Sequence, residues 1–130
     1  MREVHIFCDG ACSGNPGPAA IGVLILDFAT GAIHELSESI GEATNNIAEY
    51  TALIRGLEWA RRAGATAIEV YTDSELVARH ISGEYKVRNE GLQPLYEQAL
   101  ALLRSLGKAR VTHVPRTANR RADFLATRAL

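Results

Sequence analysis

The sequence contains only two cysteines, Cys8 and Cys12, among its 130 residues. This number excludes a disulfide-stabilised scaffold, and without a second cysteine pair or a neighbouring histidine it argues against a zinc site. Long apolar runs are also absent, since none approaches the roughly 18 residues that a membrane-spanning helix needs. No signal peptide opens the chain. We therefore expect a cytoplasmic protein with no membrane partner.

The chain carries little net charge, −1 at pH 7, but distributes it unevenly. Residues 1–54 hold seven acidic side chains and one basic side chain, whereas residues 104–130 hold seven basic and one acidic. A polyanion would therefore be bound by local basic patches, unless folding mixes the two signs evenly over the surface. The length predicts one domain spanning residues 1–130, which buries about two-thirds of its unfolded surface.

The apolar periodicity predicts the element order β-β-β-α-β-α-α-β-α in one mixed sheet. Three successive strands indicate an antiparallel meander, and the later strands, reached by helical crossovers, should be parallel. The predicted strands cover 3–8, 19–28, 32–40, 67–73 and 110–115. The predicted helices run from a cap at Thr44 or Asn46 to 63, from a cap at Ser74 to 81, from 92 to 106 and from 119 to 130. Residues 9–18 and 84–91 are expected as loops.

Four acidic residues lie where predicted elements begin or end. Asp9 and Asp73 each close a predicted strand, and Glu49 and Asp123 each lie near the start of a predicted helix. In an α/β sheet such positions share one crevice, where ligands bind. Carboxylates gathered there repel one another unless a cation holds them, and hard divalent ions prefer oxygen ligands. Two such ions about 3.5–4 Å apart are typical of phosphodiester hydrolysis.

The motifs DGACSGNPGP, TNN-x-x-E, TDS and N-x-x-A-D-x-L-A, in this order, resemble ribonuclease H of type 1. The resemblance covers the whole chain and implies the ribonuclease H-like α/β fold, a five-stranded mixed sheet flanked by helices. It implies metal-dependent endonucleolytic cleavage of the RNA strand of RNA–DNA hybrids, leaving 5′-phosphate and 3′-hydroxyl ends. By motif, the metal ligands and catalytic residues are Asp9, Glu49, Asp73 and Asp123.

The resemblance also implies two Mg²⁺ or Mn²⁺ ions when substrate is bound, with Glu49 near the ribose 2′-hydroxyl. Each carboxylate has a simpler alternative. Glu49 lies at capping-box spacing from Asn46, Asp73 is placed to cap a helix, and Asp123 is placed to complement a helix dipole. The coincidence of all four motifs favours the metal site.

The expected substrate contacts are less specific than the carboxylates. The basic helical handle that many bacterial members of the family carry is missing, and the loop 84–91 is its expected substitute. Arg116 stands where relatives place a loop histidine, while His113 is expected as a packed strand residue, and Asn119 as both helix cap and phosphate contact. The full predicted set is Gly10, Gly14, Asn15, Thr44, Asn45, Asn46, Lys86, Arg88, Asn89, Arg116 and Asn119.

Three alternatives from other classes remain. A catalytically weak module that binds hybrids or double-stranded RNA would be expected to have lost one of the four carboxylates. A transposase- or integrase-type nuclease shares the fold but lacks the TNN-x-x-E and DGACSGNPGP motifs. A domain cut from a reverse transcriptase is disfavoured by Met1 and the closing helix. Double-stranded RNA is a second potential substrate because it shares A-form shape with the hybrid. A monomer is expected.

Overall fold

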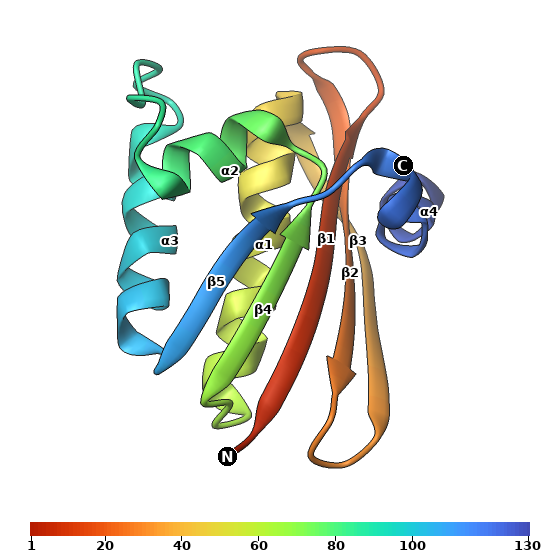
Figure 1. Cartoon of the computed structure of the whole chain (residues 1–130). Helices are drawn as coiled ribbons and strands as arrows, with labels where there is room; N and C mark the ends of the chain where they lie inside the picture. The colour runs from red at the N-terminus through yellow and green to blue at the C-terminus, as the bar shows by residue number, and fades with distance from the viewer.

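The computed structural model describes all 130 residues, which form a five-stranded mixed sheet with helices on both faces (Figure 1). The strands are β1 (Glu3–Cys12), β2 (Gly17–Asp27), β3 (Ala32–Ala43), β4 (Ala67–Thr72) and β5 (Lys108–His113). The helices are α1 (Asn45–Arg62), α2 (Glu75–Ser82), α3 (Gln93–Ser105) and α4 (Arg120–Arg128), with a 3₁₀ turn at Arg116–Ala118. None of the helices has the length and apolarity needed to cross a lipid bilayer.

The strand order is β3-β2-β1-β4-β5, antiparallel among β1, β2 and β3 and parallel among β1, β4 and β5. This confirms the predicted fold. The prediction that β1 ends at Cys8 is wrong, since only its pairing with β4 ends there, at Cys8↔Thr72. The next four residues stay paired with β2, as far as Cys12↔Ala19, so the expected loop 9–18 shrinks to a turn at 13–16.

Helix α1 covers one face of the sheet and fixes the core. Its N-cap is Thr44, whose hydroxyl accepts a hydrogen bond from the Ile47 N–H, and its apolar stripe includes the fully buried Tyr50, Leu53 and Leu57. That stripe packs on the buried face of β1, β2 and β4 in one apolar cluster. The packing orients the helix so that its N-terminus lies at the end of the sheet where β1 and β4 stop pairing (Figure 1).

Helix α4 lies on the opposite face of the sheet, to the right of the strands in Figure 1, where it contacts mainly β1 and β2. Gly22 permits this contact, because a Cβ there would lie 2.1 Å from the carbonyl oxygen of Ala122. Asn119, before α4, was expected to cap it, but its side chain makes no capping bond. Instead Nδ2 donates to the Cys8 carbonyl at 2.9 Å, and the residue is 1% exposed. Asn119 therefore ties α4 to β1 from the interior.

The remaining connections agree with the sequence in outline. Ser74 caps α2, and Gly83 ends it in a left-handed conformation with φ of 84°. A segment without helix or strand then leads to α3, so the loop predicted at 84–91 is confirmed. His113 lies in β5 as expected, but it is the last residue of the strand, and it is exposed rather than packed because β5 is an edge strand of the sheet.

Candidate active site

Three carboxylates from separate elements meet at one end of the sheet. Asp9 follows the last parallel pair of β1, Asp73 follows the end of β4, and Glu49 lies in α1. One oxygen from each side chain lies within 4.8 Å of the other two. The prediction that these three side chains lie together is therefore confirmed.

A hydrogen bond from the sheet fixes Glu49. The Gly10 backbone N–H donates to Glu49 Oε1 at 2.6 Å. The capping alternatives fail for both Glu49 and Asp73, because Thr44 caps α1 and Ser74 caps α2 through its bond from the Val77 N–H. Neither carboxylate is needed at a helix end, and both point into the shared cluster.

The fourth carboxylate, Asp123, borders this cluster. It lies in the first turn of α4, half-buried and close enough to Asp9 to add to the rise in the pKa of that carboxyl, but it is outside the three-residue group. Its helix is anchored by the Asn119 bond to β1 and by the close contact at Gly22. The structure thus brings three of the four predicted ligands together and leaves the fourth beside one of them.

Because the carboxylates are buried close together, ionisation of all of them at once is unfavourable. Desolvation raises the pKa of Asp9 to about 10, with the charges of Glu49 and Asp73 adding to the rise. Burial also raises the pKa of Glu49 to about 7, partly offset by the bond from Gly10. The Cys8 thiol lies fully buried nearby, where burial raises its pKa well above the usual value. A divalent cation would offset this repulsion, and three clustered carboxylates supply the hard oxygen donors that Mg²⁺ and Mn²⁺ prefer.

Arg116 is the cation beside the cluster. Its Nε lies 3.8 Å from Asp73 Oδ2, and its side chain is 82% exposed, compared with 8% for Asp73. The guanidinium also acts on Glu49, where its charge lowers the pKa. An exposed arginine next to a buried carboxylate can change the field of the site while still reaching a ligand in solvent.

The turn after β1 is joined to the start of α1. The Asn45 N–H donates to Asn15 Oδ1 at 2.9 Å, and Gly14 adopts a φ of 91° that favours glycine. Among the neighbouring predicted substrate contacts, the Thr44 hydroxyl already accepts the capping bond from the Ile47 N–H. Asn46 lines a hollow on the side facing the loop 84–91. The flank formed by Asn15, Asn45 and Asn46 therefore lies at the N-terminus of α1, about one helical turn from Glu49.

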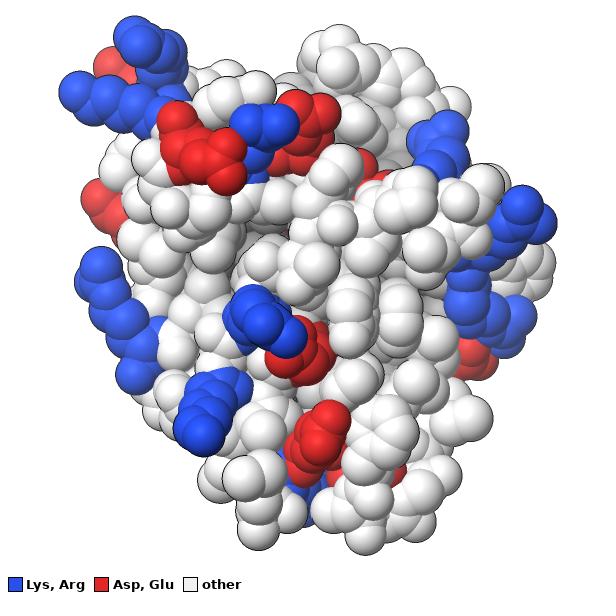
Figure 2. All heavy atoms as spheres, in the orientation of Figure 1, with Lys and Arg blue, Asp and Glu red and all other residues white.

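The hollow has a volume of about 410 Å³ and separates α1 from the loop 84–91. It is lined by predicted contacts from both sides together with residues of α2 and α3: Asn46, Leu76, His80, Glu84, Tyr85, Lys86, Arg88, Asn89 and Leu92. Lys86 and Arg88 make no ion pair within the chain, so both cations are available to an external anion. On the face shown in Figure 2, basic and acidic side chains form small separate groups with no continuous basic surface.

Sequence reasoning missed two backbone contacts that shape the site. Gly10 was assigned to substrate, but its N–H already bonds Glu49, and a Cβ there would lie 2.5 Å from Ala48 and Glu49. Gly22, which admits α4, was not singled out. A glycine inside an apolar strand is the available signal, since it often marks close approach of another backbone.

Comparisons with known proteins agree with this geometry. A family model described as "Reverse transcriptase-like" matches residues 7–129. Over 128 residues the chain is 43% identical to ribonuclease HI of Halobacterium salinarum, covering 98% of this chain and 64% of that protein. It is 37% identical to a ribonuclease H of Thiobacillus denitrificans, covering 95% of this chain and 90% of that protein. A bifunctional protein of Mycobacterium tuberculosis is 43% identical, and the chain spans only 35% of its length.

Two solved structures resemble the whole chain. The RNase H domain of a Mycobacterium tuberculosis protein superimposes with a TM-score of 0.92 and 42% identity, covering 98% of both chains. LC11-RNase H1, solved in complex with an RNA/DNA hybrid, superimposes with a TM-score of 0.88 and 40% identity, covering 97% of this chain and 95% of that one. The fold and its sequence therefore match these structures from end to end.

Proposed function

The chain belongs to the ribonuclease H family, and from this premise we propose that it hydrolyses the RNA strand of RNA–DNA hybrids as a divalent-metal-dependent endonuclease. The observation that carries the proposal is the cluster of Asp9, Glu49 and Asp73, whose oxygens lie within 4.8 Å of one another. The hybrid complex of LC11-RNase H1, a relative of 40% identity, supports the same substrate class.

The carboxylates fit a pair of divalent ions. Asp9, Glu49 and Asp73 would hold them, and Asp123 would complete the set from α4. When bound, such ions activate a water for attack on phosphorus and stabilise charge on the leaving oxygen. The products expected from that chemistry are a 5′-phosphate and a 3′-hydroxyl.

Substrate selection would come from the chain's own polar groups. Glu49 uses Oε1 to accept the Gly10 bond, which leaves Oε2 for a metal or the ribose 2′-hydroxyl that distinguishes RNA from DNA. The flank of Asn15, Asn45 and Asn46 would lie along one strand. Lys86 and Arg88 would hold phosphates of the DNA strand, in place of the missing handle.

A strand-labelled comparison tests the proposal. RNA–DNA, RNA–RNA and DNA–DNA duplexes are incubated with Mg²⁺, with Mn²⁺ or with chelator, and the ends of the products are analysed. We expect cleavage confined to the RNA strand of the hybrid, dependent on metal, and abolished in Asp9→Asn. Cleavage in excess chelator, or an intact hybrid with every divalent ion, contradicts the proposal. Cleavage of RNA–RNA would widen the substrate class, and monomeric behaviour stays a prediction.

A further inference from the structure

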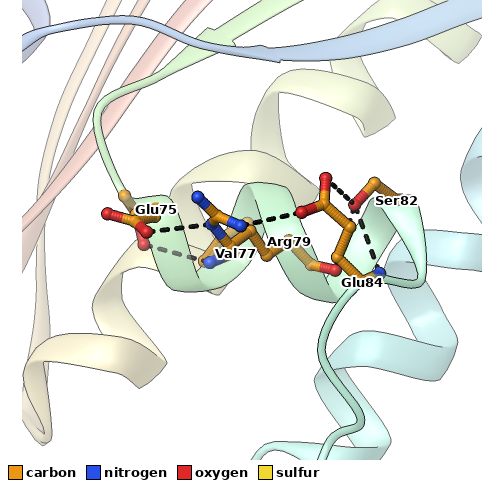
Figure 3. Close-up of polar contacts among 6 residues, drawn as sticks. Glu75, Val77, Arg79, Ser82 and Glu84 are labelled. Atoms are coloured by element: carbon orange, nitrogen blue, oxygen red, sulfur yellow. Dashed lines mark hydrogen bonds and ion pairs between the residues drawn. The ribbon is translucent and has the colours of Figure 1, made fainter.

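Arg79 of α2 holds the start of the loop 84–91 through several contacts at once. Its Nη1 donates to Glu84 Oε2 at 2.7 Å, and its Nε lies 2.9 Å from Glu75 Oε1. Figure 3 shows the guanidinium lying between these two carboxylates. The Arg79 carbonyl also accepts the Tyr85 N–H at 3.0 Å, and its Cζ lies 5.2 Å from the centre of the Tyr85 ring.

Ser82 strengthens the same attachment. Its hydroxyl donates to the Arg79 carbonyl at 3.1 Å and lies 3.4 Å from both the N–H and Oε1 of Glu84 (Figure 3). Gly83 reverses the chain between them with a φ of 84°. One exposed ion pair contributes little stability, but one guanidinium shared by two carboxylates and a ring forms a network. This network fixes the two residues that directly precede Lys86.

The rest of the loop has few attachments of its own. The backbone N–H groups of residues 86–88 make no backbone hydrogen bond. The next such bonds run from the N–H groups of Leu92 and Gln93 to the Asn89 carbonyl. Val87 packs against the core, while Lys86 and Arg88 have no partner within the chain. The position of the two cations therefore depends on the two ends of the loop, and Arg79 secures the end nearer to them.

The charge of Glu84 also bears on anion binding in the hollow. Glu84 lines the same hollow as Lys86, Arg88 and Asn46, so its carboxylate would repel a phosphate there. Pairing with Arg79 draws that carboxylate toward α2 and offsets its charge. Holding the loop and holding this carboxylate on α2 are therefore one and the same contact, which leaves Lys86 and Arg88 unpaired.

We propose that Arg79 is a positioning residue for hybrid binding, which sets Lys86 and Arg88 against the start of α1 without touching the reacting atoms. The proposal rests on the ribonuclease H function proposed above. It predicts that Arg79→Gln raises KM and the Kd for hybrid about threefold to tenfold while kcat stays within about twofold. Arg79→Lys should recover only part of this loss, because an ammonium cannot bridge two carboxylates as a guanidinium does.

The Glu84→Ala variant distinguishes a positioning role for Arg79 from a purely electrostatic one. If only net charge mattered, Arg79→Gln would weaken binding, and Glu84→Ala would strengthen it by removing a negative charge beside the phosphates. If Arg79 holds the loop through Glu84, both substitutions weaken binding. Arg62→Gln is the matched control, because this exposed arginine lies at the far end of α1 and has no partner. It should bind hybrid as the parent does.

The experiment measures hybrid binding and steady-state cleavage for the parent, these variants, and Arg79→Gln combined with Lys86→Ala and Arg88→Ala. We expect Arg79→Gln to cause no further loss once the two cations are removed, since its effect acts through them. Equal losses with and without the cations, unchanged KM in Arg79→Gln, or tighter binding in Glu84→Ala would each overturn the proposal. A parent that does not cleave hybrid would instead refute the function on which it rests.

Discussion

The Gly10 N–H donates a 2.6 Å hydrogen bond to Glu49 Oε1, and this bond joins the central strand to the first helix within the carboxylate cluster. The same glycine allows the two elements to approach, since a Cβ at Gly10 would lie 2.5 Å from the backbone of Ala48 and Glu49. Contacts that short require the backbone to move. One residue therefore sets both the distance between β1 and α1 and the orientation of a carboxylate in the cluster.

Gly10→Ala should consequently impair the site and the fold together. Overpacking of a tight backbone contact costs about 1–3 kcal/mol, so we expect a lower free energy of unfolding by urea denaturation. Displacement of Glu49 should also reduce the rise in melting temperature on addition of Mg²⁺ or Mn²⁺. A variant with parental stability and parental metal response would show that the backbone relaxes without moving Glu49.

The order of strands and helices along the chain was predictable, because alternating and continuous apolar runs separate strands from helices in this chain. The end of β1 was not predictable from local sequence. Gly10 and the breaker cluster 13–18 suggest a loop, but pairing with β2 continues the strand to Cys12. Tertiary pairing here outweighs the local signal.

Part of the site was predictable from the order of the strands and helices along the chain. Asp9 sits where the parallel pairing of β1 stops, Asp73 follows β4 and Glu49 lies near the start of α1, and the meeting of these three points follows from the topology of the sheet. The exact position of Asp123 and the burial of Asn119 depend on how closely α4 approaches β2, which Gly22 decides. No spacing within the α4 motif encodes that distance, so the capping role expected for Asn119 was wrong.

Asp73→Asn should abolish cleavage and still stabilise the metal-free protein. Its carboxylate lies within 4.8 Å of those of Asp9 and Glu49, and a neutral amide of similar shape removes that repulsion. We expect a gain on the order of 1 kcal/mol without metal and a smaller metal-induced rise in melting temperature. Thermal melts with and without Mg²⁺ measure both. Glu97→Gln, an exposed acid on α3, is the control and should change neither quantity.

Arg116→Ala should slow turnover without abolishing it. The guanidinium lies 3.8 Å from Asp73 but is 82% exposed, so screening by solvent limits its effect to about threefold to tenfold in kcat. An arginine does not act as a base near neutral pH, so its contribution is electrostatic. Arg116→His should retain activity, and Arg116→Lys should lie between the parent and Ala. Unchanged kcat in Arg116→Ala would remove this residue from the reaction.

The paired substitution Lys86→Ala and Arg88→Ala should weaken hybrid binding more than it slows the chemical step. Both cations line the hollow beside α1 and lack partners within the chain. Each lost phosphate contact should flatten the slope of log affinity against log salt by roughly 0.7–0.9. Binding titrations at four salt concentrations give the slope. The matched pair Arg61→Ala and Arg62→Ala, at the opposite end of α1, should leave it unchanged. If the loop variant and the control variant give the same salt-dependence slope, the loop makes no phosphate contact.

Asp27 should make stability depend on pH, independently of the active site. Its carboxylate is 1% exposed and accepts a 2.6 Å hydrogen bond from Arg2, which lowers its pKa below the usual value. A depressed carboxyl pKa contributes stability that is present above the unfolded value, about 3.9, and is lost as pH falls through the folded pKa. Asp27→Asn should therefore reduce the free energy of unfolding at pH 7. The deficit relative to the parent should shrink as pH drops below about 4, because the parent then loses the same charged contact. Urea denaturation at a series of pH values measures the deficit, and a deficit that stays constant across the series would show that packing, not the Arg2 ion pair, stabilises this corner of the sheet.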